Sequence, residues 1–197
     1  MIIIGIDNGV SGTLAAFKNN KLIDFKESFT KKWLKPTVKA KASYMTRIDV
    51  PALMGWLKNI IKESDNARII IERSMTDQRR LHATLSSHHA QEATMIAIEL
   101  LNIPYMTIDS SVWQKREIPG VKGSEFLKIA SKEKCITEFP KFKKLIEKHG
   151  DGDAILIAKA FVDNPGLFID DYDRVPKKRS TEFKKVFKTN FTQEKTL

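Results

Sequence analysis

The hydrophobic pattern at the start of the chain predicts three strands. Residues 2–7 form an almost continuous apolar run that ends on Asp7, which is typical of a strand buried on both faces. Turn residues separate this run from a second expected strand at 13–17, and a further turn precedes a third at 22–29. The three segments together predict an antiparallel meander.

The rest of the chain alternates between helical and strand-like patterns. Apolar residues spaced i, i+3, i+4 after Asp49 predict a helix with Pro51 in its first turn, and residues 68–72 predict a buried strand that ends on Glu72. Four more elements are expected: a long helix at 83–101, a strand at 105–108, a helix at 125–134 that follows the loop 119–124 with Ser124 as its cap, and an apolar helix at 153–162. This order predicts an α/β fold with a mixed five-stranded sheet, an antiparallel meander followed by parallel strands, flanked by helices.

Composition is that of a globular protein. Of the 197 residues, 42% are hydrophobic and 29% are charged, and the apolar runs are too short to cross a bilayer, so no membrane association is expected. The single cysteine, Cys135, excludes an intramolecular disulfide framework and a cysteine-based zinc cluster, and we interpret it as a small core residue. With no secretory signal in the sequence, the cytosol is the expected location.

The net charge of +10 is concentrated in two segments. Residues 26–47 hold seven Lys and Arg against one acid, and residues 174–197 hold eight against two. Two basic segments on a slightly acidic body favour a polyanionic partner such as nucleic acid, while a solvated loop and a solubilising tail are the alternative. We place a compact domain at 1–170 and a basic C-terminal tail at 171–197.

Acidic residues are expected to converge at one edge of the sheet. Asp7 and Glu72 end buried strands, and Asp151 and Asp153 precede or begin the last helix. Carboxylates without a basic partner repel one another, and Mg²⁺ or Mn²⁺ would neutralise them in a site able to hydrolyse phosphodiesters. Taken singly, each acid has another interpretation: a turn former, a strand end that reaches solvent, or a helix N-cap.

Four segments in order resemble a known family. They are IIIGIDNGVSG at 2–12, IIIE at 69–72, VWQKR with GVKGS between 112 and 124, and GDGDAILIA at 150–158. Together they resemble RuvC-type Holliday junction resolvases in the compact form found in phages and organelles. The resemblance spans about residues 2–162, and it implies a ribonuclease H-like fold.

The resemblance also implies an activity and a set of ligands. Members of the family are homodimeric, Mg²⁺-dependent endonucleases that nick two opposing strands of a four-way DNA junction. By motif match, Asp7, Glu72 and Asp153 would bind metal. The family usually has an acid or histidine three residues before the last aspartate, where this chain has Gly150, so the fourth ligand is either Asp151, which we favour, or His149.

DNA-contacting residues follow from the same resemblance. Lys122 would lie near the scissile phosphate, with Lys128 as the alternative. In the segment 74–80, Met75 would act as a wedge between bases, and Arg79 and Arg80 would contact phosphates.

Several features outside these motifs have more than one interpretation. The helix at 83–101 supplies either a dimer interface or core, and we interpret His88-His89 as a polar helix face rather than a metal site. Trp33 and Tyr44 either stack on bases or cover the core.

Three other functions share features with this sequence. Actin-like and sugar kinases also begin with a strand ending Gly-Ile-Asp, but they need two domains, and this chain has room for one. A catalytically silent, architectural junction-binding protein would share the fold, and so would a ribonuclease H-type or transposase-like nuclease. The resemblance favours a junction resolvase in the cytosol of a bacterium or of a phage-infected host.

Overall fold

The computed structural model describes residues 1–34, 44–62 and 66–164. Its strands are β1 Ile2–Ile6, β2 Thr13–Lys18, β3 Lys21–Glu27, β4 Thr30–Leu34, β5 Tyr44–Ile48, β6 Ala67–Glu72 and β7 Tyr105–Ile108. Its helices are α1 Val50–Ile60, α2 Leu81–Leu100, α3 Ser110–Glu117, α4 Ser124–Glu138, α5 Lys143–His149 and α6 Asp153–Val162, with short 3₁₀ turns η1 Gln78–Arg80 and η2 Pro140–Phe142. The predicted boundary near 170 and the basic tail lie outside the described residues.

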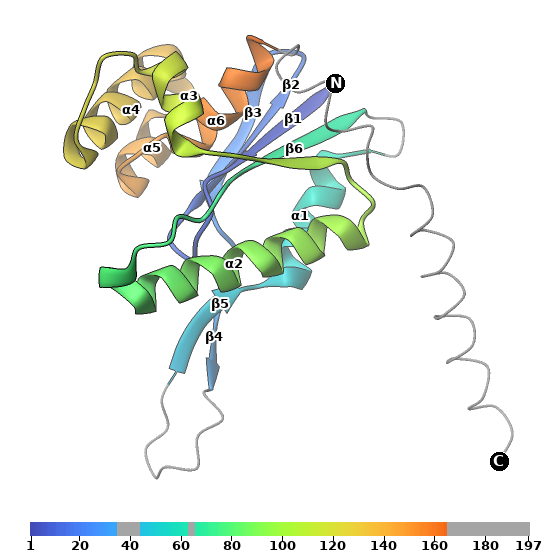
Figure 1. Ribbon diagram of the computed structural model, residues 1–197. Coiled ribbons are helices and arrows are strands. Elements are labelled where there is room, and N and C mark those ends of the chain that lie inside the picture. The colour runs from blue at the N-terminus through green and yellow to red at the C-terminus, as the bar shows by residue number, and fades with distance from the viewer. Residues whose placement is uncertain (35–43, 63–65, 165–197) are drawn as a thin grey trace, which may run out of the picture. The chain divides into compact units, whose positions relative to one another are not determined.

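Five strands form a mixed sheet in the order β3-β2-β1-β6-β7 (Figure 1). Strands β1, β2 and β3 pair antiparallel, whereas β1, β6 and β7 pair parallel. The predicted fold class, a meander followed by parallel strands, is therefore confirmed. Ile6 lies opposite Ile71 in the parallel pair, so the residues that follow them, Asp7 and Glu72, emerge side by side.

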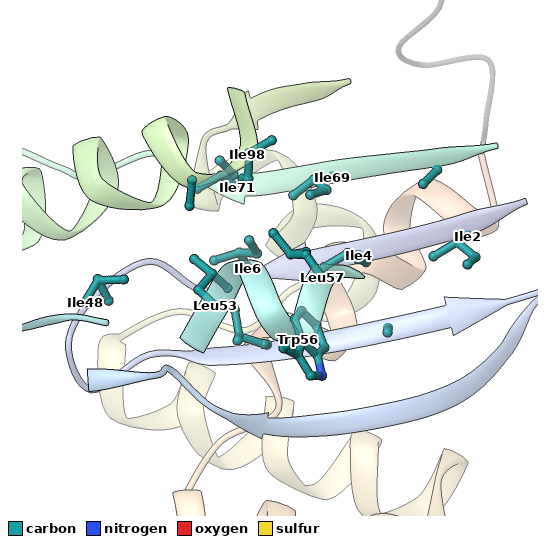
Figure 2. Close-up of a cluster of buried hydrophobic side chains, with 14 of the residues drawn as sticks. Ile2, Ile4, Ile6, Ile48, Leu53, Trp56, Leu57, Ile69, Ile71 and Ile98 are labelled. Atoms are coloured by element: carbon teal, nitrogen blue, oxygen red, sulfur yellow. The ribbon is translucent and has the colours of Figure 1, made fainter. Parts of the chain in front are cut away.

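Alternate residues of β1 face different helical layers, as the period of a strand requires. Ile2, Ile4 and Ile6 belong to a core cluster with side chains from α1, α2 and β6, among them Leu53, Leu57 and Ile98 (Figure 2). On the other face, α6 packs against β1 and β2. A Cβ at Gly5 would overlap the backbone oxygen of Ala154, so glycine is required for this approach.

Helix α6 lies where the sequence predicts it, and it is the most buried helix in the described part of the chain. Seven of its ten residues, from Ala154 to Phe161, are buried. Such a helix has no polar face and must be covered on all sides, here by the sheet, α3 and α4. Among the residues that the structure describes, no helix has the length and apolar character needed to cross a membrane.

Three local predictions differ from the structure. The basic stretch 26–47, in which no strand was expected beyond residue 29, contains β4 and β5, paired as a separate two-stranded antiparallel sheet. Helices α3 and α5 were not predicted, because their short polar sequences lack a clear apolar stripe. Ser124 is not the cap of α4: it is the first helical residue, and Gly123, at φ 92°, takes the cap position.

Candidate active site

Three elements bring the predicted acids together at the carboxyl ends of β1 and β6. Asp7 follows β1, and Glu72 is the last residue of the neighbouring strand β6. Helix α6, which begins at Asp153, packs on one face of the sheet against β1, β2 and β6. Its first turn lies near the carboxyl end of β1, because the backbone oxygen of Ala154 closely approaches Gly5. Asp151 lies two residues before this helix. The sheet register and the packing of α6 therefore place all four acids in one neighbourhood.

The four acids act on one another electrostatically. Burial raises the pKa of Asp7 well above its usual range, and the charges of Glu72, Asp153 and Asp151 raise it further. Burial raises the pKa of Glu72 to about 7, again with a contribution from Asp153 and Asp151. The pKa of Asp153 rises to about 6, mainly through burial, and that of Asp151 also rises through burial. In this environment, the charged form of each acid is therefore less favourable, relative to its protonated form, than it is in water.

Two hydrogen-bond donors hold two of these carboxylates. The indole Nε1–H of Trp113, on α3, donates to Glu72 Oε2 at 2.8 Å. The hydroxyl of Ser131, on α4, donates to Asp153 Oδ1 at 2.5 Å and accepts from the backbone N–H of Gly152 at 3.3 Å. Both donor residues are buried, and both bonds lower the pKa of the carboxyl group that accepts them. They fix the carboxylate orientations.

Sequence reasoning missed Ser131 and the contact made by Trp113. Trp113 lies within one of the motifs, but the sequence does not indicate which acid it contacts, 41 residues away. The weak signal for Ser131 is its spacing on α4: it precedes the buried Cys135 by one helical turn and shares its face. Cys135 in turn lies against Gly152, where a Cβ would overlap its sulfur.

Asp151 and His149 have different surroundings. Helix α5 ends at His149 and is followed by Gly150, which has a left-handed φ of 87°, so His149 and Asp153 do not share one continuous helix. His149 Nδ1 lies 2.9 Å from Glu27 Oε1, and its ring packs edge-on against Phe25. Asp151 Oδ1, by contrast, is buried without a hydrogen-bond partner in the described structure. Asp151 is therefore the better candidate for a fourth ligand.

The two candidate lysines also differ. Lys128, on α4, is among the charges that lower the pKa of Asp7, Asp151 and Asp153, so its ammonium group lies within the field of the acids. Lys122 is exposed on the loop before α4 and is not among the principal charges acting on them. The structure thus associates Lys128, rather than Lys122, with the acids.

The segment between β6 and α2 lies beside the site. The side-chain amide of Asn8, next to Asp7, donates to Ser74 Oγ at 2.5 Å and to the backbone oxygen of Ser87 at 3.1 Å. Met75, which follows, is 73% exposed. The nearby Arg79 and Arg80 are exposed as well, and Arg79 Nε pairs with Asp77 at 3.4 Å. Asn8 therefore connects the end of β1 to the segment that carries these exposed side chains.

The donor set fits a hard divalent cation. Its members are carboxylates, which Mg²⁺ and Mn²⁺ prefer as ligands. The buried Asp151 Oδ1 accepts no hydrogen bond within the described structure, and a bound cation would satisfy this oxygen. Within the described residues, no three His, Cys, Asp or Glu side chains are already arranged to hold one ion. His88 and His89 lie on α2, where both are exposed, and His88 Nε2 lies 3.2 Å from the hydroxyl oxygen of Thr76.

Comparison with known proteins identifies similar structures only. The sequence matches no protein-family model and no curated protein. The fold is similar to RuvC from Thermus thermophilus in complex with a Holliday junction substrate, at a TM-score of 0.46 and 11% identity over 82% of this chain and 92% of that chain. A second structure of the Thermus thermophilus protein gives 0.45 and 12%, over 82% and 93%. Because these values are low, the function proposed below depends on this chain's own residues.

Proposed function

We propose that the protein is a metal-dependent endonuclease that resolves four-way or otherwise branched DNA junctions. The observation that carries this proposal is the meeting of four half-buried acids, Asp7, Glu72, Asp151 and Asp153, at one edge of the sheet. Burial and mutual repulsion make this arrangement costly for the fold alone. A cation-binding catalytic role explains the arrangement better than packing does.

The residues of the site have distinct roles in this proposal. Held by the four acids, Mg²⁺, for which Mn²⁺ can substitute, would activate water and stabilise the leaving oxygen of a phosphodiester. Trp113 and Ser131 keep Glu72 and Asp153 in the orientation needed for binding. Lys128 supplies positive charge beside the acids, where it would offset the charge that develops on the reacting phosphate.

Branched DNA is proposed as the substrate for two reasons. The motifs resemble those of RuvC-type resolvases, and the segment beside the acids presents an apolar side chain together with cations. In this proposal Met75, which is 73% exposed, contacts bases at the centre of the junction. Arg79 and Arg80 contact the phosphates of the arms.

Cleavage of labelled DNA tests the proposal. The protein is incubated with a synthetic four-way junction and a matched linear duplex, in Mg²⁺ or in EDTA. We expect paired, ligatable nicks on the junction alone, and none in EDTA. Cleavage of an RNA–DNA hybrid instead of the junction would indicate a ribonuclease H-type enzyme.

A catalytically silent junction-binding protein is the second candidate. It is favoured by the finding that, in the part of the chain that the structure describes, no three acids are already arranged around one ion. Tight binding of the junction without cleavage in Mg²⁺ or Mn²⁺ would establish this candidate and contradict the enzyme.

The two lysines provide a prediction about catalysis. We expect Lys128→Ala to lower the cleavage rate at saturating DNA by about 100-fold, since removal of one electrostatic stabiliser of a transition state has effects of this order. Lys122→Ala should lower the cleavage rate by less than about tenfold, because Lys122 is not among the principal charges that shift the pKa values of Asp7 and Glu72. Single-turnover rates measure both. A larger loss in Lys122→Ala would restore Lys122 as the residue near the scissile phosphate.

The bond from Trp113 to Glu72 provides a second prediction. Trp113→Phe removes the donor but keeps an aromatic ring, so we expect Mg²⁺ binding about tenfold weaker by calorimetry, as for other residues that orient metal ligands. Trp56→Phe is the matched control, because Trp56 Nε1–H donates to Asp24 Oδ2 at 2.7 Å outside the acid cluster. Equal Mg²⁺ affinities in the two variants would show that the Trp113 bond does not orient a ligand.

A homodimer is also proposed, through α2. Leu81, Leu85, Ile96 and Leu100 are 57%, 46%, 44% and 54% exposed, and their spacing aligns them along one side of this helix. We expect light scattering to give about twice the monomer mass for the native protein and the monomer mass for Leu85→Glu. Leu145→Glu changes an exposed leucine on α5 and serves as the control. A dimer that persists in Leu85→Glu would exclude this side of α2 as the interface.

A further inference from the structure

Strands β4 and β5 form a ribbon with two exposed faces. Trp33 lies opposite Met45, and Leu34 lies opposite Tyr44. Since side chains alternate along a strand, the first pair lies on one face and the second pair on the other. Trp33, Leu34 and Tyr44 are 47%, 58% and 61% exposed. These side chains do not cover the core, so that interpretation of Trp33 and Tyr44 is wrong.

The ribbon carries positive charge on both faces. Lys31 lies opposite Arg47, and Lys32 lies opposite Thr46, so Arg47 shares the face of Trp33, while Lys32 is on the face of Tyr44. Each face thus combines a cation with an exposed aromatic ring.

Only one of these cations has a partner among the residues that the structure describes. Lys31 Nζ pairs with Asp49 Oδ1 at 3.2 Å and lies 4.8 Å from the centre of the Trp33 ring. Lys32 and Arg47 form no ion pair within that part of the chain, and neither strand contains an acid. Their charges are therefore available to an anionic partner.

The base of the ribbon is fixed to the body of the protein. Ile48, the last residue of β5, belongs to the core cluster, and the N–H of Asp49 donates to the backbone oxygen of Phe29 at 2.8 Å. Strand β5 also contacts α2, and the two strands extend away from the five-stranded sheet (Figure 1). The ribbon is therefore an anchored arm whose side chains face solvent.

We infer that this ribbon binds a duplex arm of the DNA substrate by entering one of its grooves, an inference that rests on the proposed function. The major groove of DNA accepts a two-stranded β-ribbon. Phosphates line both walls of a groove, which suits one cation on each face, here Lys32 and Arg47. The ribbon of a second copy is a poor partner, because two such arms would bring like charges together.

Binding measurements in EDTA, where no cleavage is expected, test the inference. Fluorescence anisotropy with a labelled four-way junction gives Kd over a range of salt concentrations. We expect Lys32→Ala/Arg47→Ala to raise Kd about tenfold and to reduce the slope of log K against log salt by about 2, one for each lost phosphate contact. Trp33→Ala and Tyr44→Ala, which leave the charge unchanged and remove apolar contacts to base edges in the groove, should each raise Kd about fivefold with the slope preserved.

A matched control removes the same charge elsewhere. Lys21→Ala/Lys58→Ala changes two exposed lysines, one at the start of β3 and one in the last turn of α1. Lys21 pairs with Lys18, which lies opposite Ile2, so it is at the end of the sheet away from Asp7. This variant should bind the junction with nearly the native Kd and salt slope.

The outcomes separate the ribbon from the proposed function. Native Kd values and slopes in all three ribbon variants, in a protein that binds and cleaves the junction, would overturn the ribbon inference alone. A change of mass of the ribbon variants in light scattering, with no change in Kd for DNA, would show that the ribbon contacts a second copy of the protein. That result would also overturn the ribbon inference. Failure of the native protein to bind branched DNA would contradict the proposed function itself.

Discussion

Replacement of Asp7 by Asn is expected to abolish junction cleavage and to leave junction binding intact. The charges of the other three acids all raise the pKa of Asp7, so Asp7 lies at the centre of the cluster. Asparagine has nearly the same shape but no negative charge, and it would weaken cation binding with little change in packing. We expect cleavage to fall by at least about 1000-fold, since removal of a central catalytic group has effects of this size or more.

The measurement compares single-turnover cleavage with Kd for the same junction in EDTA. Asp24→Asn serves as the control, because Asp24 is an acid on β3 that binds Trp56 rather than the acid cluster. Its cleavage rate should stay within a few-fold of native. Cleavage by Asp7→Asn at the native rate would show that Asp7 is not part of the active site. The metal-dependent mechanism would then lose its main support.

The parts of the fold that the sequence predicts well are those with strong hydrophobic periodicity. The apolar run at 2–7 and the helix at 153–162 correspond closely to β1 and α6, because each is buried from every side. The ribbon was missed for the opposite reason. With both faces exposed, β4 and β5 contain lysine and arginine where a half-buried strand would alternate polar with apolar residues.

The site shows a similar division. That Asp7 and Glu72 meet follows from strand order alone, because both end neighbouring parallel strands. The contribution of Lys128 and Ser131 depends on how α4 packs against α6, which no local pattern encodes. The choice between Asp151 and His149 likewise depends on the left-handed turn at Gly150 and on the contact of His149 with Glu27.

Glu72→Gln is expected to stabilise the metal-free protein at pH 8 and to have no such effect near pH 4.5. Burial raises the pKa of Glu72 from 4.5 to about 7 in the folded protein. Between these values the folded state keeps a proton that the unfolded state releases, so the free energy of unfolding falls as pH rises and stays low above pH 7. The shift corresponds to a cost of roughly 3 kcal/mol at pH 8.

Glutamine avoids this cost and keeps an oxygen that can accept the Trp113 hydrogen bond. Thermal unfolding in EDTA should therefore give a Tm roughly 6–12 °C higher for Glu72→Gln than for the native protein at pH 8, and equal values near pH 4.5. Glu133→Gln, an exposed position on α4, should leave Tm unchanged at both pH values. A Tm difference between Glu72→Gln and native protein that does not depend on pH would contradict the raised pKa.

Added Mg²⁺ separates a metal site from a merely strained cluster. A cation that binds the folded state alone raises the free energy of unfolding in proportion to the logarithm of its concentration over Kd. The native protein should gain stability with Mg²⁺ at pH 8. Glu72→Gln, which lacks one negative charge in the ligand set, should gain less stability, so the difference in Tm between the two proteins narrows. If Mg²⁺ and Mn²⁺ leave the native Tm unchanged, the acids do not form a cation site. Repulsion among the four acids would then remain without a catalytic explanation. The proposed function requires metal binding to restore the free energy of unfolding that this repulsion lowers.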